Sequence, residues 1–351
     1  MSRTAIVLFN LGGPDRPESV EPFLFNLFND RAIIGLPQPL RWLLAKLISR
    51  RRAPVAREIY ANLGGGSPLL PETEAQARAL ETALSDLGEV RAFPAMRYWH
   101  PMTPETVRAV SEFAPDRLVL LPLYPQFSTT TTGSSLRAWR EAASGIQAET
   151  VTVCCYPTLP GLVRGQVTAI VAAHGTMAAQ GRPRVLFSAH GLPKKVIEAG
   201  DPYQWQVEQT AAAVVAGLAG EGLNELDWTV CYQSRVGPLE WIGPSTEDEI
   251  DRAGADGVPL VVVPIAFVSE HSETLVELDI EYRERAEQKG VPGYARIPTL
   301  SVAEPFIEGL ADVVRTALQR PDAQPRVAEA CGKGRVCPQA WSGCPAKEAG
   351  A

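Results

Sequence analysis

Short apolar runs alternate with amphipathic stretches along the whole chain, and this alternation predicts repeated strand–helix units. The strands are expected at 5–9, 89–95, 117–121, 150–154, 184–188, 227–231 and 259–264. The helices are expected at 72–87, 103–113, 205–218, 246–252 and 273–288. The runs at 118–121 and 261–263 are apolar at every position, which is typical of parallel strands that helices cover on both faces.

This pattern is that of an α/β protein, and 351 residues exceed one average domain. We therefore expect two doubly wound (Rossmann-like) domains with parallel sheets. The first is expected over 1–150, joined by a C-terminal helix near 303–319, and the second over 151–320. Residues 321–351 lose the periodicity and are rich in Pro, Gly and Cys, so they are expected to form a tail.

The composition narrows the class of protein. With 45% hydrophobic and 21% charged residues, the chain can bury a large globular core. A formal charge of −7 argues against a nucleic-acid partner, because no basic excess is available to displace counterions from phosphates. The apolar run after Arg3 stops at Asn10, which is too short for a signal peptide or a membrane span. A cytoplasmic enzyme is expected, in which the six cysteines do not form structural disulfides.

Polar groups follow two of the predicted buried strands. His190 comes just after the strand at 184–188, and His271 and Glu273 come after the strand at 259–264. Ligands of such sheets bind outside the carboxyl ends of the strands, so these side chains are expected beside a cleft. A lone histidine is more often a hydrogen-bonded structural residue, but a loop position favours a functional role for His190.

Glu273, Glu277 and Glu281 recur at every fourth position of the predicted helix, which places three carboxylates on one face. One interpretation is a solvated acidic face. The other is a row of oxygen ligands along which a divalent cation passes into the cleft. The spacing alone leaves both open.

The segments 22–28, 33–37 and 42–44 are unusually apolar and are followed by three arginines at 50–52. A buried helical hairpin would explain them. So would an apolar lip that admits a flat hydrophobic ligand and rests on a membrane surface with the help of the basic cluster.

Eight stretches, in the same order along nearly the whole chain, together resemble the ferrochelatase family. They are Asn10-Leu-Gly-Gly-Pro14, Gly64-Gly-Gly-Ser-Pro68, Met96-Arg-Tyr98, Leu123-Tyr-Pro-Gln126 with Thr132-Gly-Ser-Ser135, Ser188-Ala-His-Gly-Leu-Pro193, Cys231-Tyr-Gln-Ser-Arg-Val-Gly-Pro238, Trp241-Ile-Gly-Pro244 and Phe267-Val-Ser-Glu-His-Ser-Glu-Thr-Leu275, the last running on to Glu281.

The resemblance implies insertion of Fe²⁺ into a porphyrin that is held in a cleft between two parallel-sheet domains. It makes His190 and Glu273 the catalytic pair, with Glu277 and Glu281 extending the proton relay or the iron path. A neutral imidazole can accept a pyrrole proton, and a carboxylate beside it can relay that proton or hold the metal. The residues that would line the macrocycle or hold its propionates are Tyr60, Arg97, Tyr98, Ser135 and Trp241.

One position bears on the choice of porphyrin. Some bacterial relatives carry tyrosine where this chain has Leu11, and those relatives act on coproporphyrin. Leu11 offers no ligand atom for iron, so protoporphyrin IX is the expected substrate, with coproporphyrin III as the alternative.

The tail cysteines Cys331, Cys337 and Cys344 fit the [2Fe-2S] cluster that several family members bind through one internal and three C-terminal cysteines. By the same resemblance the internal ligand is Cys155, with Cys154 as the second choice. A structural zinc site and an unliganded tail are the alternatives. Cys231 lies within a predicted strand and is expected to be packed core.

Other functions compete with this interpretation. A chelatase that inserts cobalt or nickel into another tetrapyrrole has less use for the apolar segments and the cysteine tail. A porphyrin or haem carrier does not need His190 and Glu273 together. A nucleotide-dependent oxidoreductase is excluded, because the glycine loops at 12–13 and 64–66 match neither GxGxxG nor a P-loop. Peripheral contact with the inner membrane, the oligomeric state, the side of iron entry and the role of the cluster stay open.

Overall fold

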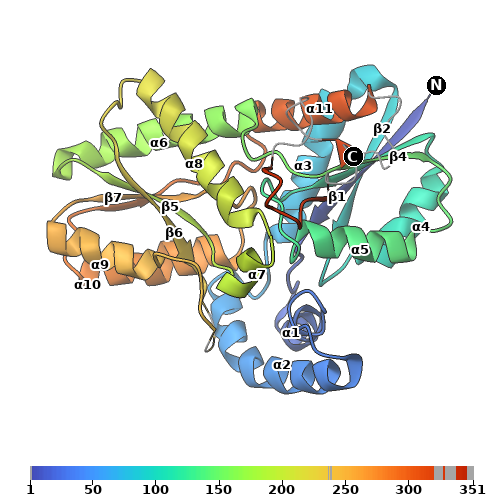
Figure 1. The fold of residues 1–351 in the computed structure, drawn as a ribbon, viewed down its shortest axis with the longest axis horizontal. Helices are drawn as coiled ribbons and strands as arrows, with labels where there is room; N and C mark the ends of the chain where they lie inside the picture. Colours follow the sequence, from blue (N-terminus) through green and yellow to red (C-terminus); the bar gives the residue numbers. More distant parts are fainter. Residues whose placement is uncertain (1, 236, 238, 320–326, 329–336, 346–351) are drawn as a thin grey trace.

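The computed structural model describes residues 2–235, 237, 239–319, 327–328 and 337–345. Within them the chain forms two parallel β-sheets that lie side by side and are covered by helices (Figure 1). The first sheet has the order β2-β1-β3-β4-β9, with β1 (Arg3–Asn10), β2 (Glu89–Met96), β3 (Arg117–Pro122), β4 (Glu149–Val153) and β9 (Val327–Ala328). The second has the order β6-β5-β7-β8, with β5 (Arg184–His190), β6 (Asp227–Gln233), β7 (Leu260–Pro264) and β8 (Tyr294–Arg296). The predicted fold class is confirmed.

The helices connect successive parallel strands or extend from the sheets. They are α1 (Val20–Phe28), α2 (Gln38–Ala61), α3 (Leu69–Ala83), α4 (Thr103–Phe113), α5 (Thr132–Ala142), α6 (Pro160–Met177), α7 (Lys194–Glu198), α8 (Tyr203–Gly220), α9 (Thr246–Asp256), η4 (Glu273–Glu281), α10 (Tyr282–Gln288) and α11 (Glu304–Leu318). Short 3₁₀ turns lie at Pro17–Ser19, Ser85–Leu87 and Ala178–Gln180.

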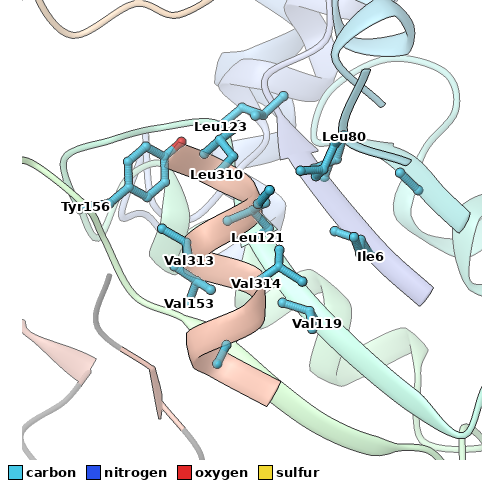
Figure 2. Packing of buried hydrophobic residues seen from close by; sticks show 14 of the residues in the cluster. Ile6, Leu80, Val119, Leu121, Leu123, Val153, Tyr156, Leu310, Val313 and Val314 are labelled. Carbon is cyan, nitrogen blue, oxygen red and sulfur yellow. The ribbon is translucent and has the colours of Figure 1, made fainter. Parts of the chain in front are cut away.

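The first core lies on both faces of the sheet because β1 is apolar on both faces. Ile6 and Leu8 pack with residues of α3 and α11, such as Leu80 and Leu310 (Figure 2). The alternate position Phe9 packs with α4 and α5 on the other face. Alternation of side chains along a strand assigns successive residues to opposite cores.

The second sheet is built in the same way around β5, which pairs in parallel with β6 and β7. Phe187 faces α6 and α8, whereas Leu186 faces α9 and α10. Cys231 is fully buried in the Leu186 core, as expected for a cysteine that acts as a small apolar residue.

All seven predicted strands are present with ends that differ by at most two residues. β8 and β9 were not predicted, because they have three and two residues and carry too little pattern. The boundary predicted at residue 150 falls inside β4, which pairs with β3 and so belongs to the first sheet. Helix α11, from the far end of the chain, packs on α3 and on the first sheet.

The hairpin of α1 and α2 extends beyond both sheets (Figure 1). Its inner side is buried, and Phe23 and Leu24 pack there near Tyr60. Its outer side is exposed to solvent. Leu43 keeps 60% of its surface exposed, and it is one of six large apolar residues between 33 and 47 that are exposed. The interpretation of this segment as a buried hairpin is therefore wrong for α2. None of the described helices has both the length and the apolar character needed to cross a bilayer.

Candidate active site

His190 and Glu273 meet at the carboxyl edge of the second sheet. His190 is the last residue of β5, and Glu273 begins η4, nine residues after the end of the neighbouring strand β7. Because β5 and β7 are parallel, their carboxyl ends lie at the same edge, and the two side chains come together. The His190 Nδ1 atom lies 2.8 Å from Glu273 Oε2. The side chains keep 39% and 25% of their surface exposed, so a ligand can reach them.

Ser234 joins two carboxylates below this pair. Its hydroxyl lies 3.1 Å from Glu273 Oε2 and 2.5 Å from Glu277 Oε2, and its backbone N–H donates to Glu277 Oε1 at 2.9 Å. Ser234 follows β6 with a left-handed backbone (φ 61°), which turns both its N–H and its hydroxyl toward the carboxylates. A hydroxyl has one proton, so it can donate to only one of them at a time and can accept from the other.

Glu277 is held by two further side chains. Gln233 Nε2 donates to its Oε2 at 3.1 Å, and the Tyr282 hydroxyl donates to its Oε1 at 3.0 Å. Sequence reasoning gave no role to Gln233, Ser234 or Tyr282. The first two lie within the matched stretch around Cys231 and could have been found there, but no sequence signal marks Tyr282.

The segment Glu273–Glu281 is a π-helix rather than the predicted α-helix, which begins only at Tyr282. π-helical turns are rare and are frequently found at functional sites. Glu273 and Glu277 both face Ser234, whereas Glu281 is exposed. The structure therefore brings together two of the three carboxylates, and the third lies toward solvent.

The charges of the site shift its proton affinities in opposite directions. Burial alone would lower the pKa of His190, but the charge of Glu273 and the hydrogen bond to it outweigh burial and raise that pKa. Burial would raise the pKa of Glu273, but chiefly the His190 charge brings it down to about 2. Burial and the Glu273 charge raise the pKa of Glu277. Glu273 therefore makes His190 more basic than burial alone would leave it, and Glu277 is a more basic carboxylate that Ser234 joins to Glu273.

His271 has a different environment. It is buried, packs edge-on against Phe267 with ring centroids 4.6 Å apart, and its Nδ1 accepts a hydrogen bond from the Thr274 N–H at 3.3 Å. Burial lowers its pKa, so the ring is neutral. These contacts match a structural histidine.

Two of the predicted porphyrin-contacting residues lie beside the pair. Tyr60, at the end of α2, is buried against Ser272 and Glu273, and burial raises its pKa to about 12 while Ser272 acts in the opposite sense. Trp241 packs against Gly191, the residue after His190, where an added Cβ would lie 3.4 Å from the indole ring. The first domain thus places a phenol against the segment of the second domain that carries Glu273.

Arg97 and Tyr98 lie in the first domain around a buried carboxylate, Asp30, and Ser135 follows Ser134, which also contacts that carboxylate. Arg97 Nη2 and the Tyr98 hydroxyl each lie 2.8 Å from Asp30 Oδ2, and Ser134 also donates to it. Only Arg97 has appreciable surface, with 22% of its side chain exposed, whereas Tyr98 and Ser135 are 1% exposed.

Four of the cysteines gather where the first domain, the second domain and the tail meet. Cys154 and Cys155, which follow β4, pack with Cys337 and Cys344 of the tail, and all four are buried. Hydrogen bonds from Cys154, and to a lesser extent from Cys337, hold the pKa of the Cys155 thiol well below its usual range. The pKa values of Cys154 and Cys337 are raised, because their thiols donate to Cys155 and also contact Cys344. Cys331 lies outside the described residues. In the described part of the chain, no three His, Cys, Asp or Glu side chains are arranged to hold a metal ion.

A solved structure shares this fold. SirB from Bacillus subtilis with Fe³⁺ superposes with a TM-score of 0.50 over 90% of this chain and 95% of SirB. At 10% sequence identity the likeness shows the fold alone. By its fold the protein is therefore an α/β protein of two parallel-sheet domains, with an imidazole–carboxylate pair at the strand ends of the second.

The family follows from the sequence. The ferrochelatase family model matches residues 3–318. Ferrochelatase of Caulobacter vibrioides (strain NA1000 / CB15N) is 57% identical over 99% of this chain and 98% of its own length. Those of Phenylobacterium zucineum and Hyphomonas neptunium are 57% and 51% identical over 92% and 99% of this chain, and 94% and 95% of their own lengths. The chain belongs to the ferrochelatase family, and insertion of iron into a porphyrin to make haem is its reaction.

Proposed function

We propose that this chain inserts Fe²⁺ into protoporphyrin IX to give protohaem, with release of two protons, and that His190 and Glu273 are the catalytic pair. The observation that carries this proposal is the hydrogen-bonded contact of 2.8 Å between the two side chains at the carboxyl edge of the second sheet. A porphyrin carrier has no chemical need for an imidazole and a carboxylate that are coupled in this way.

The pair suits proton removal because the two ring nitrogens of His190 have different surroundings. His190 Nδ1 is bonded to Glu273, and among the described residues no hydrogen bond engages Nε2. With Nδ1–H donated to a carboxylate, Nε2 becomes the basic nitrogen and can take a pyrrole proton. Glu273 then carries the counter-charge of the imidazolium that forms.

Ser234 and Glu277 extend this path. A proton that moves from His190 to Glu273 can pass through the Ser234 hydroxyl to Glu277, whose pKa is raised by burial and by the Glu273 charge. Two pyrrole protons leave the macrocycle as one Fe²⁺ enters it, so the charge of the ring is unchanged, and the site returns to its starting charge once both protons have passed to solvent. Glu277 and the exposed Glu281 serve as oxygen ligands on the path of the incoming iron, for which carboxylates are suitable donors.

The porphyrin would lie between the two domains. Tyr60 and Trp241 would contact the ring beside the catalytic pair, and Arg97, Tyr98 and Ser135 would hold it on the first domain. The Arg97 guanidinium, partly exposed and paired with Asp30, supplies the charge that a propionate requires. Tyr98 and Ser135 would need to become exposed for direct contact.

Leu11 supports protoporphyrin IX as the substrate. It lies at the end of β1 beside the aromatic cluster of Tyr98 and Trp99, where an aliphatic side chain suits vinyl groups better than extra propionates. The test compares both porphyrins with the wild type and Leu11→Tyr. Faster insertion into coproporphyrin III by the wild type would overturn this choice.

The test of the catalytic proposal uses protein that is purified without oxygen. Protoporphyrin IX absorbance is followed after Fe²⁺ is added, and porphyrin binding is measured separately. His190→Ala should lose at least about 100-fold in kcat, because a general base contributes on that order, and should still bind the porphyrin. A wild type that binds porphyrin but never metallates it would favour the carrier.

We also propose that the tail holds a [2Fe-2S] cluster through Cys155, Cys331, Cys337 and Cys344, with Cys154 as the alternative internal ligand. The donor chemistry fits, since the described cysteines supply only soft sulfur, their thiols are buried together, and Cys155 has thiolate character. When bound, such a cluster supplies one-electron redox chemistry. Iron and sulfide analysis of the wild type, Cys155→Ser and Cys154→Ser tests this proposal, and zinc in place of iron and sulfide would overturn it.

A further proposal is that the protein works in the cytoplasm with its α1–α2 hairpin in contact with the inner membrane. Leu40, Leu43 and Leu47 recur at helical spacing on one exposed face of α2, and three exposed arginines follow at 50–52. Apolar anchors beside basic side chains suit an anionic lipid surface. The protein should sediment with phosphatidylglycerol vesicles and lose this binding when Leu43 and Leu47 are replaced by serine. Wild-type protein that stays in the supernatant would contradict the proposal.

A further inference from the structure

Gln206, on α8 of the second domain, is fully buried against the thiols. Its Nε2 atom donates to Cys337 Sγ at 3.0 Å and to Cys155 Sγ at 3.4 Å. Its Oε1 atom accepts the backbone N–H of Phe127 at 2.7 Å. One amide therefore contacts the first domain, the loop after β4 and the tail.

The contact with Phe127 fixes which way the amide points. Only the oxygen of the amide can accept a backbone N–H, so the –NH₂ group must face the two sulfurs. Both of its donors are then used on Cys155 and Cys337. A buried donor costs free energy unless it is satisfied, and neutral thiols are weak acceptors. Charge-assisted hydrogen bonds to thiolates are roughly twice as strong as neutral ones, so this amide suits sulfurs that carry negative charge, as the ligand sulfurs of a metal centre do.

We propose that Gln206 sets the reduction potential of the iron–sulfur centre by donating two hydrogen bonds to its ligand sulfurs. This inference rests on the proposed cluster and concerns Cys155 and Cys337, so it does not depend on which cysteine supplies the remaining positions. Hydrogen bonds to ligand sulfurs stabilise the more negative, reduced state, and they therefore raise the potential. The hydrogen bonds described for the Gln206 amide run to Phe127, Cys155 and Cys337, so it acts on the centre through its ligands.

The test measures redox equilibrium and not turnover. Wild type, Gln206→Leu and Gln206→Met are purified without oxygen, iron and sulfide are quantified, and the visible spectrum is followed during a reductive titration. Both variants keep the volume of the side chain and lack the donors. Gln204→Leu is the matched control, because Gln204 lies on the same helix and its amide bonds to Glu208 instead of sulfur.

At the wild-type midpoint potential, the ratio of reduced to oxidised centre should fall about tenfold in both Gln206 variants, which equals a shift of about −59 mV for one electron. The midpoint potential of Gln204→Leu should equal that of the wild type. A Gln206→Leu or Gln206→Met centre with the wild-type midpoint would overturn the inference and leave the cluster proposal standing.

Two other outcomes are decisive. Wild-type protein that contains neither iron nor sulfide after anaerobic purification removes both the cluster and the role of Gln206. A centre that is lost from both Gln206 variants, in protein whose circular dichroism and melting match the control, would show a role in assembly and would overturn tuning.

Discussion

Gln76 on α3 links the first domain to the loop of the second domain that precedes Glu273. It is 1% exposed, and its Nε2 donates to the carbonyl of Val268 at 2.9 Å and to that of Ser301 at 3.2 Å. Its Oε1 accepts the Ser269 hydroxyl at 3.0 Å. Val268 and Ser269 belong to the loop that leads from β7 to Glu273. We therefore expect Gln76 to position that loop as well as to stabilise the fold.

Gln76→Leu keeps the size of the side chain and takes a hydrogen bond away from three polar groups. An orphaned buried group costs about 1–3 kcal/mol. The carbonyl of Val268 keeps the backbone N–H of Ser301 at 2.9 Å, and the carbonyl of Ser301 is only partly buried and can bind water, so the Ser269 hydroxyl bears most of the cost. The free energy of unfolding should fall by about 2 kcal/mol. A shift of the loop would also lengthen the contact between His190 and Glu273, and displacement by about 1 Å can cost on the order of 100-fold in rate, so kcat should fall by about tenfold or more.

Urea denaturation gives the stability change, and steady-state insertion of iron gives kcat and the KM for each substrate. Glu74→Leu, at an exposed position of the same helix, is the control and should leave both quantities near wild type. If Gln76→Leu unfolds within about 0.5 kcal/mol of the wild type and retains its kcat, the loop is positioned by other contacts and this reasoning is refuted.

Three further outcomes follow from the contacts described. Glu273→Gln removes the charge that raises the pKa of His190, so the acid limb of the pH profile of kcat/KM should move to lower pH as the maximal rate falls; an unmoved limb would argue against coupling. Asp30→Ala strips Arg97 of its buried partner, and urea melts should show a loss of about 3 kcal/mol, whereas a loss below about 1 would mean that solvent replaces the carboxylate. Gly161→Ala places a methyl group 2.0 Å from a carbonyl oxygen of α11, so Tm should fall by several degrees, and an unchanged Tm would show that α6 and α11 can separate.

The main strands and the meeting of His190 with Glu273 could be predicted from the sequence, and the reason is local. A strand that is covered on both faces must be apolar at successive positions, so β1, β3 and β7 are visible in the chain itself. The carboxyl ends of parallel strands share an edge, so His190 and Glu273 could be expected near one cleft although 83 residues separate them. The family motifs single out these two residues but do not give the distance between them.

Only the tertiary structure decided the remaining features, because they depend on partners that are distant in the chain. The segment that carries the row of carboxylates is a π-helix, and Ser234, which follows β6, joins Glu273 to Glu277. The apolar patterns of α-helical and π-helical turns are too similar for sequence periodicity to separate them. β9 forms only by pairing with β4. The donors of Gln76 and Gln206 find carbonyls and sulfurs across the domain interface. A buried polar group must form a hydrogen bond, but the sequence alone does not indicate its partner atom. The packing of the two domains selects that partner.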